Sequence, residues 1–152
     1  MTERSAAHAT FVIIRDYPAS PQRVFKAFSD PKAKALWFEG GGDWTVLERE
    51  MDFREGGREW SKGRWGNGVV SDFRCTYFDI VPDERIVFAY DMYVNDAKIS
   101  VSLTTVELKP EGSGTRLTFT EQDVFLDGFD DAGGREQGTR ELLDRLGESL
   151  SS

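Results

Sequence analysis

The sequence predicts an α+β fold in which a curved antiparallel sheet of seven strands wraps around one long C-terminal helix. Extended runs fill most of the chain from Val69 to Val124, and each is longer than the usual strand of about 5–6 residues. A single long amphipathic helix follows them. Long twisted strands with only one such helix to cover them cannot form a flat two-layer block. The sheet is therefore expected to curl around the helix and to leave a cavity between them.

The first part of the chain predicts one strand, two short helices and two more strands. Residues 1–8 are polar and are expected to be loose. Ser20-Pro21 and Asp30-Pro31 each place a capping side chain before a proline, which is tolerated at the first helical position. Gly40–Gly42 ends the second helix. The expected elements are a strand at Thr10–Tyr17, helices beginning at Pro21 and Pro31, and strands at Trp44–Phe53 and Arg58–Lys62.

The rest of the chain reads as an antiparallel meander closed by a helix. Short polar turns separate the extended runs, and short connections favour antiparallel neighbours. Leu142, Leu143 and Leu146 form one face of the last helix. Gly138 and Gly147 lie inside that helix, which indicates either a close backbone approach or room for a ligand. The expected elements are strands at Val69–Ile80, Arg85–Tyr93, Lys98–Leu108 and Thr115–Val124, and a helix at Arg135–Leu150.

Length and composition predict one domain over residues 1–152 and exclude several classes of function. The net charge of −8 repels phosphate groups, so neither a nucleic acid nor a membrane surface is expected as a partner. No run approaches the about 18 apolar residues of a membrane-spanning helix, and no leader is recognisable. Cys75 and His8 are the only residues of their types, so no disulfide, metal site or cofactor is expected. We expect a cytoplasmic location.

Four stretches resemble the motifs of one family. They are SPQRVFKAFSDPKAKALWF (Ser20–Phe38), MDFREGGREW (Met51–Trp60), DIVPDERIVFAY (Asp79–Tyr90) and GTRLTFTE (Gly114–Glu121). In this order they resemble the family of activator-of-heat-shock-protein-90-ATPase homologues, within the START-like, or SRPBCC and birch-pollen-allergen-like, superfamily. The resemblance spans Phe11 to Leu150 and implies the helix-grip fold.

Two positions depart from the pattern of that family. Cys75 stands where the family usually has a glycine, and Thr139 follows Gly138 where the family usually has a tryptophan. The missing tryptophan implies a larger or reshaped end of the cavity.

Alternation along the strands places large side chains on the inner face of the sheet. On the strand at Arg85–Tyr93 the phase of Phe88 and Tyr90 is expected to face inward, and Val101 and Leu103 are expected to continue it. Plain core packing is the alternative for each. The residues expected to line a ligand-binding cavity are Trp37, Phe38, Trp60, Phe73, Cys75, Tyr77, Phe88, Tyr90, Met92, Val101, Leu103, Phe119, Leu142 and Leu146.

Catalytic groups are few. His8 lies in the segment expected to be loose, which excludes Ser-His-Asp and Cys-His arrangements. Cys75 is expected to pack as a small hydrophobe. Arg54 is expected either to tie its turn through a salt bridge to Asp52 or Glu121, or to anchor a ligand carboxylate at the cavity mouth.

Glu121 is the better candidate for acid–base chemistry. It shares the inward phase of Leu117 and Phe119, and burial in an apolar cavity would raise its pKa. The alternative is a solvated carboxylate at the end of its strand.

Three functions follow. We expect a small hydrophobic or aromatic molecule to be bound in the cavity without chemistry. An enzyme of the polyketide cyclase or hydrolase type, using Glu121, Arg54 or Tyr77, is one alternative that the superfamily implies. A co-chaperone is the other, but a chaperone partner is not expected for a single acidic domain. A homodimer through exposed strand edges or loops stays open.

Overall fold

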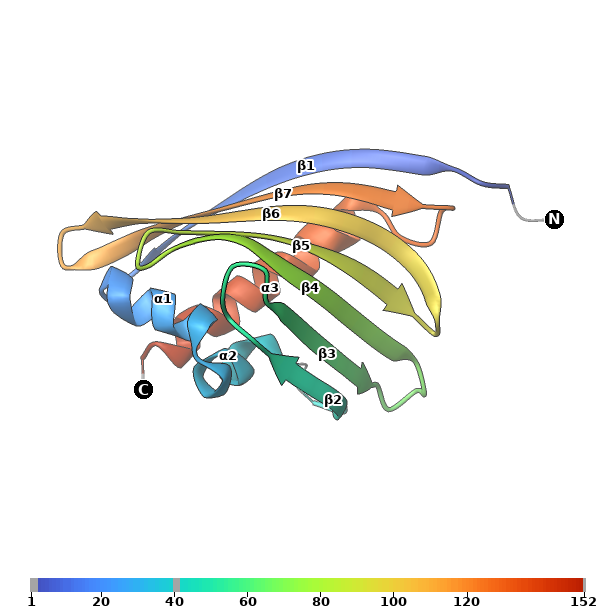
Figure 1. The fold of residues 1–152 in the computed structure, drawn as a ribbon, viewed down its shortest axis with the longest axis horizontal. Coiled ribbons are helices and arrows are strands. Elements are labelled where there is room, and N and C mark those ends of the chain that lie inside the picture. The colour runs from blue at the N-terminus through green and yellow to red at the C-terminus, as the bar shows by residue number, and fades with distance from the viewer. Residues whose placement is uncertain (1–2, 40–41, 152) are drawn as a thin grey trace.

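The computed structural model describes residues 3–39 and 42–151. It has the predicted α+β architecture, a seven-stranded antiparallel sheet curved around a long C-terminal helix (Figure 1). The predicted fold class is therefore confirmed. The elements are β1 (Ala6–Tyr17), α1 (Pro21–Ser29), α2 (Pro31–Phe38), β2 (Thr45–Met51), β3 (Arg58–Arg64), β4 (Val70–Val81), β5 (Arg85–Val94), β6 (Ala97–Glu111), β7 (Gly114–Leu126) and α3 (Ala132–Ser149).

The strands follow the order β1-β7-β6-β5-β4-β3-β2. From β2 to β7 the chain is a meander in which each strand pairs antiparallel with the next. The first strand, β1, pairs with the last one, β7. The two short helices α1 and α2 therefore carry the chain from one edge of the sheet to the other, across the concave side that α3 also occupies (Figure 1).

Side-chain caps start all three helices. Ser20 accepts a hydrogen bond from the backbone N–H of Arg23, and Asp30 accepts one from Ala33, as the two proline-containing motifs predict. Asp131 accepts one from the N–H of Gly134, so α3 begins at Ala132, one turn before the predicted start.

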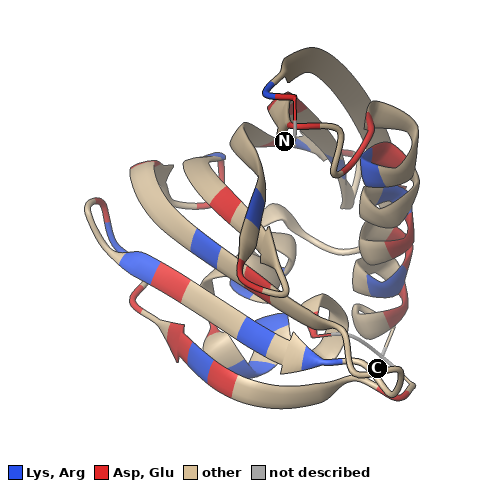
Figure 2. Ribbon diagram, turned by 90° about the vertical axis from the view of Figure 1, so that its right-hand side faces the viewer, with Lys and Arg blue, Asp and Glu red and all other residues tan. Residues whose placement is uncertain are grey.

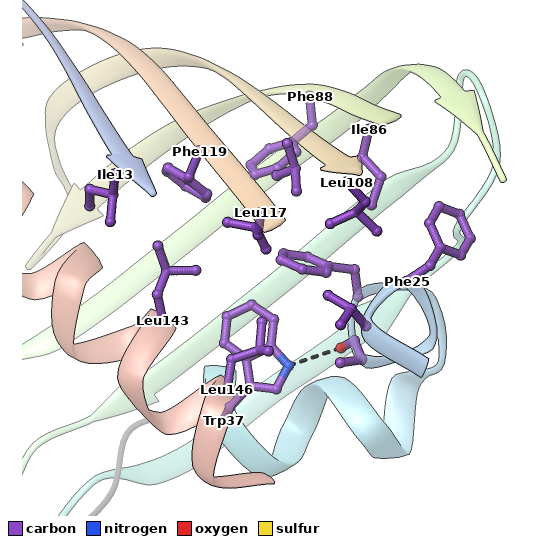
Figure 3. Close-up of a cluster of buried hydrophobic side chains, with 14 of the residues drawn as sticks. Ile13, Phe25, Trp37, Ile86, Phe88, Leu108, Leu117, Phe119, Leu143 and Leu146 are labelled. Atoms are coloured by element: carbon purple, nitrogen blue, oxygen red, sulfur yellow. Dashed lines mark hydrogen bonds between the residues drawn. The ribbon is translucent and has the colours of Figure 1, made fainter. Parts of the chain in front are cut away.

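The core lies between the concave face of the sheet and the inner face of α3 (Figure 3). Leu143 and Leu146 of α3 are almost fully buried, as are Leu117 and Phe119 of β7. Full burial of such a side chain contributes about 1.5–3 kcal/mol. Trp37 closes the core from α2, and its indole N–H donates to the carbonyl oxygen of Ala27 at 2.9 Å.

The N-terminal strand is longer than the sequence predicts. It begins at Ala6, and His8 is paired opposite Val124 rather than lying in a loose segment. The pairing with the long β7 gives even this polar stretch backbone hydrogen bonds, which outweigh its weak strand propensity. His8 is exposed all the same. Residues 1–2 of the expected loose segment, and Gly40 and Gly41 of the expected helix end, lie outside the described residues.

Gly138 and Gly147, the two glycines of the predicted helix, meet different surroundings in α3. A Cβ at Gly147 would lie 3.0 Å from the ring of Tyr17, so this glycine allows a close approach between α3 and β1. A Cβ at Gly138 would meet nothing within 4 Å. One glycine thus serves packing, and the other leaves open space beside the helix.

Candidate functional site

A cavity of about 490 Å³ lies between the concave face of the sheet, α2 and α3. Rings from several elements are in contact along its wall. The ring centroids of Phe38 and Phe73 are 5.0 Å apart, and those of Phe73 and Tyr90 are 4.8 Å apart. The predicted residues that line the cavity are Trp37, Phe38, Phe73, Phe88, Tyr90, Met92, Phe119, Leu142 and Glu121.

Exposed residues in the lining mark the mouth of this cavity. Trp65 is 38% exposed, and Gly138 of α3 is also exposed. Trp44 lies beside Trp65 with 6.4 Å between the ring centroids. Its indole packs directly on Gly63 of β3, where a Cβ would lie 2.0 Å from the ring. Glycine at this position therefore lets Trp44 lie flat against the strand at the mouth.

Three predicted cavity residues lie on the outer face of the sheet, and these predictions are wrong. Val101 and Leu103 are 38% and 42% exposed. A register shift between β5 and β6 passes over Ile99, so that Ser100 and Ser102 face inward instead. Trp60 is half-buried on the outer face, with its N–H donating to Asp72 at 2.6 Å.

Other predicted residues are buried in the core without lining the cavity. Cys75 is 3% exposed, and burial raises the pKa of its thiol to about 12, which makes it unreactive. Tyr77 is 1% exposed and Leu146 is fully buried. The hydroxyl of Tyr77 donates to the carboxylate of Glu59.

Arg54 does not reach the cavity. Its side chain is 68% exposed and pairs with Asp52 at 2.8 Å in the turn between β2 and β3. Of the expected roles, the salt bridge to Asp52 is observed, whereas the anchor at the cavity mouth and the pairing with Glu121 are wrong. Glu121, Arg54 and Tyr77 thus do not form one constellation, because each contacts a different set of residues.

At one end of the cavity lies a polar group that we call the Glu121 cluster, formed by Tyr90, Thr104, Glu121, Asp123 and Arg135. Glu121 is 1% exposed and accepts hydrogen bonds from Tyr90 at 2.9 Å and from Thr104 at 3.1 Å. The guanidinium of Arg135 is 3.9 Å from Glu121 and 3.8 Å from Asp123, so one cation faces both carboxyl groups.

The Glu121 cluster holds two carboxyl groups against one cation. Burial, followed by the neighbouring Asp123, raises the pKa of Glu121 to about 8, so its carboxyl group is mostly protonated at neutral pH. Asp123 Oδ2 has no hydrogen-bond partner among the described residues. Arg135 directs its terminal N–H groups at the hydroxyl groups of Tyr90, Ser102 and Ser100, and at Asp130. The four donors of its two terminal nitrogens are therefore taken.

Beneath the α2 side of the cavity lies a second group, the Lys34 cluster, formed by Lys34, Arg49, Glu59 and Tyr77. Lys34 lines the cavity, and its Nζ is 2.5 Å from Glu59 Oε1. Arg49 donates to the other oxygen of Glu59 at 2.7 Å. Burial alone raises the pKa of Glu59, but the charges of Lys34 and Arg49 outweigh it and hold that pKa below its usual value. Glu59 is therefore ionised.

Sequence reasoning missed Lys34, Glu59 and Arg135. The helical spacing contains a signal for two of them, because Lys34 precedes the cavity residue Phe38 by four positions and Arg135 precedes Leu142 by seven. Glu59 gives no such signal, since its partner Lys34 is 25 positions away in the chain. Thr139 also lines the cavity.

Acidic and basic residues alternate along β2, β3 and α3 rather than separating to opposite sides (Figure 2). Across residues 3–39 and 42–151, no three His, Cys, Asp or Glu side chains gather to hold a metal ion. Within those same ranges, no helix is both long and apolar enough to cross a membrane.

Two solved structures are similar to this chain over nearly its whole length. A solved structure of an uncharacterised protein from Rhizobium leguminosarum is 47% identical, with a TM-score of 0.94 over 99% of each chain. The Mll3558 protein from Rhizobium loti is 49% identical, with a TM-score of 0.88 over 95% of this chain and 99% of that one. The comparison with curated proteins found no match.

An AHSA1-like protein from Aeromonas hydrophila is 19% identical, with a TM-score of 0.72 over 94% of this chain and 92% of that one, and so shares the fold. The sequence itself matches the family described as activator of Hsp90 ATPase homolog 1-like protein over residues 18–151. That match confirms the resemblance seen in the four motifs. The chain belongs to the activator of Hsp90 ATPase homolog 1-like family.

Proposed function

We propose that the protein binds a small, largely apolar or aromatic ligand in the cavity between the sheet and α3. The observation that carries this proposal is a cavity of about 490 Å³ with a wall of aromatic rings. Ligand sites in proteins have volumes of about 300–1,000 Å³, apolar walls and a few polar groups. The Glu121 and Lys34 clusters supply those polar groups here.

Access to the cavity supports the proposal as well. The exposed residues Trp65 and Gly138 both line the cavity, and the space beside Gly138 is free. A core that was filled by its own side chains would not leave such a gap, because protein interiors are packed to about 0.74 of their volume. The open side gives a small molecule a route to the aromatic wall.

A matched pair of glycine variants tests the proposal. Gly138→Phe places a ring at the mouth, whereas Gly133→Phe places one on the first turn of the same helix, at a residue that does not line the cavity. Neither change is expected to weaken α3, because phenylalanine has a higher helix propensity than glycine. The probe is N-phenyl-1-naphthylamine, an uncharged dye whose fluorescence rises in apolar surroundings.

We expect saturable binding of one dye per wild-type chain. Gly138→Phe should weaken it by at least about tenfold, and Gly133→Phe should leave it within about twofold. Native mass spectrometry of the freshly purified protein complements this titration, because a retained small molecule would name the chemical class of the ligand. Absence of saturable dye binding to the wild-type chain, or equal effects of the two variants, would contradict the proposal.

A further inference from the structure

Lys34 is an unusual residue for the wall of an apolar cavity. Its side chain is only 4% exposed. Lysine is almost never fully buried unless its charge is paired, because an ammonium group loses its hydration on burial. The rings nearest to its Nζ are Phe38, with 4.4 Å to the centroid, and Phe88, with 6.0 Å, and both line the cavity. The charge of Lys34 thus lies at the cavity surface.

The hydrogen bonds of Lys34 are incomplete. An ammonium group carries three N–H donors, and Glu59 Oε1 is the only acceptor that the described residues offer to Nζ. Glu59, in contrast, receives donors from Lys34, Arg49 and Tyr77, so both of its oxygens are taken. The remaining donors of Lys34 have no acceptor except what enters the cavity beside Phe38 and Phe88.

The local charge balance also favours an anion beside Lys34. The buried part of the Lys34 cluster holds two cations, Lys34 and Arg49, against the single carboxylate of Glu59. Glu39 lies 3.8 Å from Arg49 but is about a quarter exposed, and water weakens its effect. A second anion at Nζ would complete both the charge balance and the hydrogen bonds.

The Glu121 cluster at the other end of the cavity does not offer such a site. Arg135 has acceptors for its terminal N–H groups, and the carboxyl group of Asp123 beside it would repel an anion. Arg145 also lines the cavity, but it is half-buried and its Nε donates to the carbonyl oxygen of Trp37. Among the described residues, Lys34 is therefore the most deeply buried cation that lines the cavity and still has unpaired N–H donors.

We propose that Lys34 binds the carboxylate of an amphipathic ligand, so that the cavity takes an aromatic or aliphatic carboxylic acid whose apolar body lies along the aromatic wall. This inference rests on the proposed function, because it names the class of ligand for the same cavity. The acid group is held by one ion pair and by up to two hydrogen bonds from Nζ. The apolar body is held by burial against Phe38, Phe73 and Phe88.

The test compares 2-naphthoate with 2-naphthamide, which has nearly the same shape but no charge, as competitors of N-phenyl-1-naphthylamine at about pH 7. We expect the wild-type protein to bind the acid at least about tenfold more tightly than the amide. Lys34→Met should remove this preference while keeping the affinity for the amide within about twofold. Lys32→Met, at an exposed position on the same helix, should leave both affinities unchanged.

Several outcomes would overturn the inference. These are equal affinities for acid and amide in the wild type, a preference that survives in Lys34→Met, or one that is lost in Arg145→Met instead. If Lys34→Met does not fold, Lys34→Gln keeps a donor toward Glu59 and serves the same comparison. Failure of the dye itself to bind would instead contradict the proposed function, so the two failures are distinguishable.

Discussion

Glu59 and Glu121 are the same residue type, are each 1% exposed and both point to the inner face of the sheet, yet their pKa values move in opposite directions. The pKa of Glu59 is lowered, whereas that of Glu121 is raised to about 8. Burial acts on both in the same sense, since it disfavours the charged form. The difference must come from their neighbours.

The neighbours of Glu59 are two cations and a hydroxyl, and all three donate directly to its oxygens. Glu121 receives two hydroxyl groups, and Arg135, the one cation paired with it among residues 3–39 and 42–151, is 3.9 Å away and shared with Asp123. Depth of burial and residue type therefore do not decide whether a carboxyl group is charged. The charge of the carboxyl group depends instead on how many cations contact it without being shared with a neighbouring acid.

Glutamine substitutions at Glu59 and Glu121 should give the largest difference in unfolding free energy between the two sites. Glu59→Gln leaves Lys34 and Arg49 buried without an anion, and removal of one partner from a buried ion pair costs about 3–5 kcal/mol of unfolding free energy. Glu121→Gln replaces a mostly neutral group by one of the same shape and should cost less than about 1 kcal/mol. Urea denaturation near pH 7 measures both values. Equal losses would mean that the two carboxyl groups share one charge state.

The pH dependence of the unfolding free energy should give the second-largest difference between Glu59 and Glu121. Between pH 4.5 and about 8 the folded protein holds a proton on Glu121 that the unfolded chain has lost. The free energy of unfolding should therefore fall as the pH rises through this window, by at most about 1.4 kcal/mol per pH unit. Glu121→Gln should flatten that slope in urea titrations between about pH 5.5 and about pH 8. Glu59 acts in the opposite sense, because its contribution is lost as the pH falls below its ordinary value.

The two tyrosines that donate to these carboxyl groups give the smallest difference. Tyr77 donates to the charged Glu59, and loss of such a hydrogen bond costs about 1.5–3 kcal/mol. Tyr90 donates to the mostly neutral Glu121, for which the cost is about 0.5–1.5 kcal/mol, and it also accepts from Arg135, whose Nη1 keeps Ser102 as a second acceptor. Tyr77→Phe should therefore destabilise the protein more than Tyr90→Phe when both are unfolded in urea at neutral pH. The reverse order would contradict the assigned charge states.

The sequence predicted the fold and much of the cavity wall because those features rest on local patterns. The caps at Ser20 and Asp30 and the alternation that turns Phe88 and Tyr90 inward are readable within a few residues. Glu121 was placed correctly by the same alternation, since it continues the inward phase of Phe119.

The parts that were missed depend on contacts between distant segments. β3 turns Glu59 and Ser61 inward and Trp60 outward, against the usual preference of these side chains. That arrangement is stable because Lys34 and Arg49 neutralise Glu59, and no local pattern reveals a counterion from another element. The inward phase of β6 was missed for a different reason, because a register shift at one residue exchanges its two faces.

That register shift also has an evolutionary consequence. The extra residue at Ile99 is what turns the hydroxyl groups of Ser100 and Ser102 toward Arg135 and leaves Val101 and Leu103 outside. Regular pairing of the same residues, without the bulge, would place Val101 opposite Tyr90 and Leu103 opposite Phe88, turn both aliphatic side chains inward and withdraw the acceptors that now hold the guanidinium. A relative whose β5–β6 hairpin closes without this bulge would therefore present an apolar end of the cavity in place of a polar one, with the same side chains along β6.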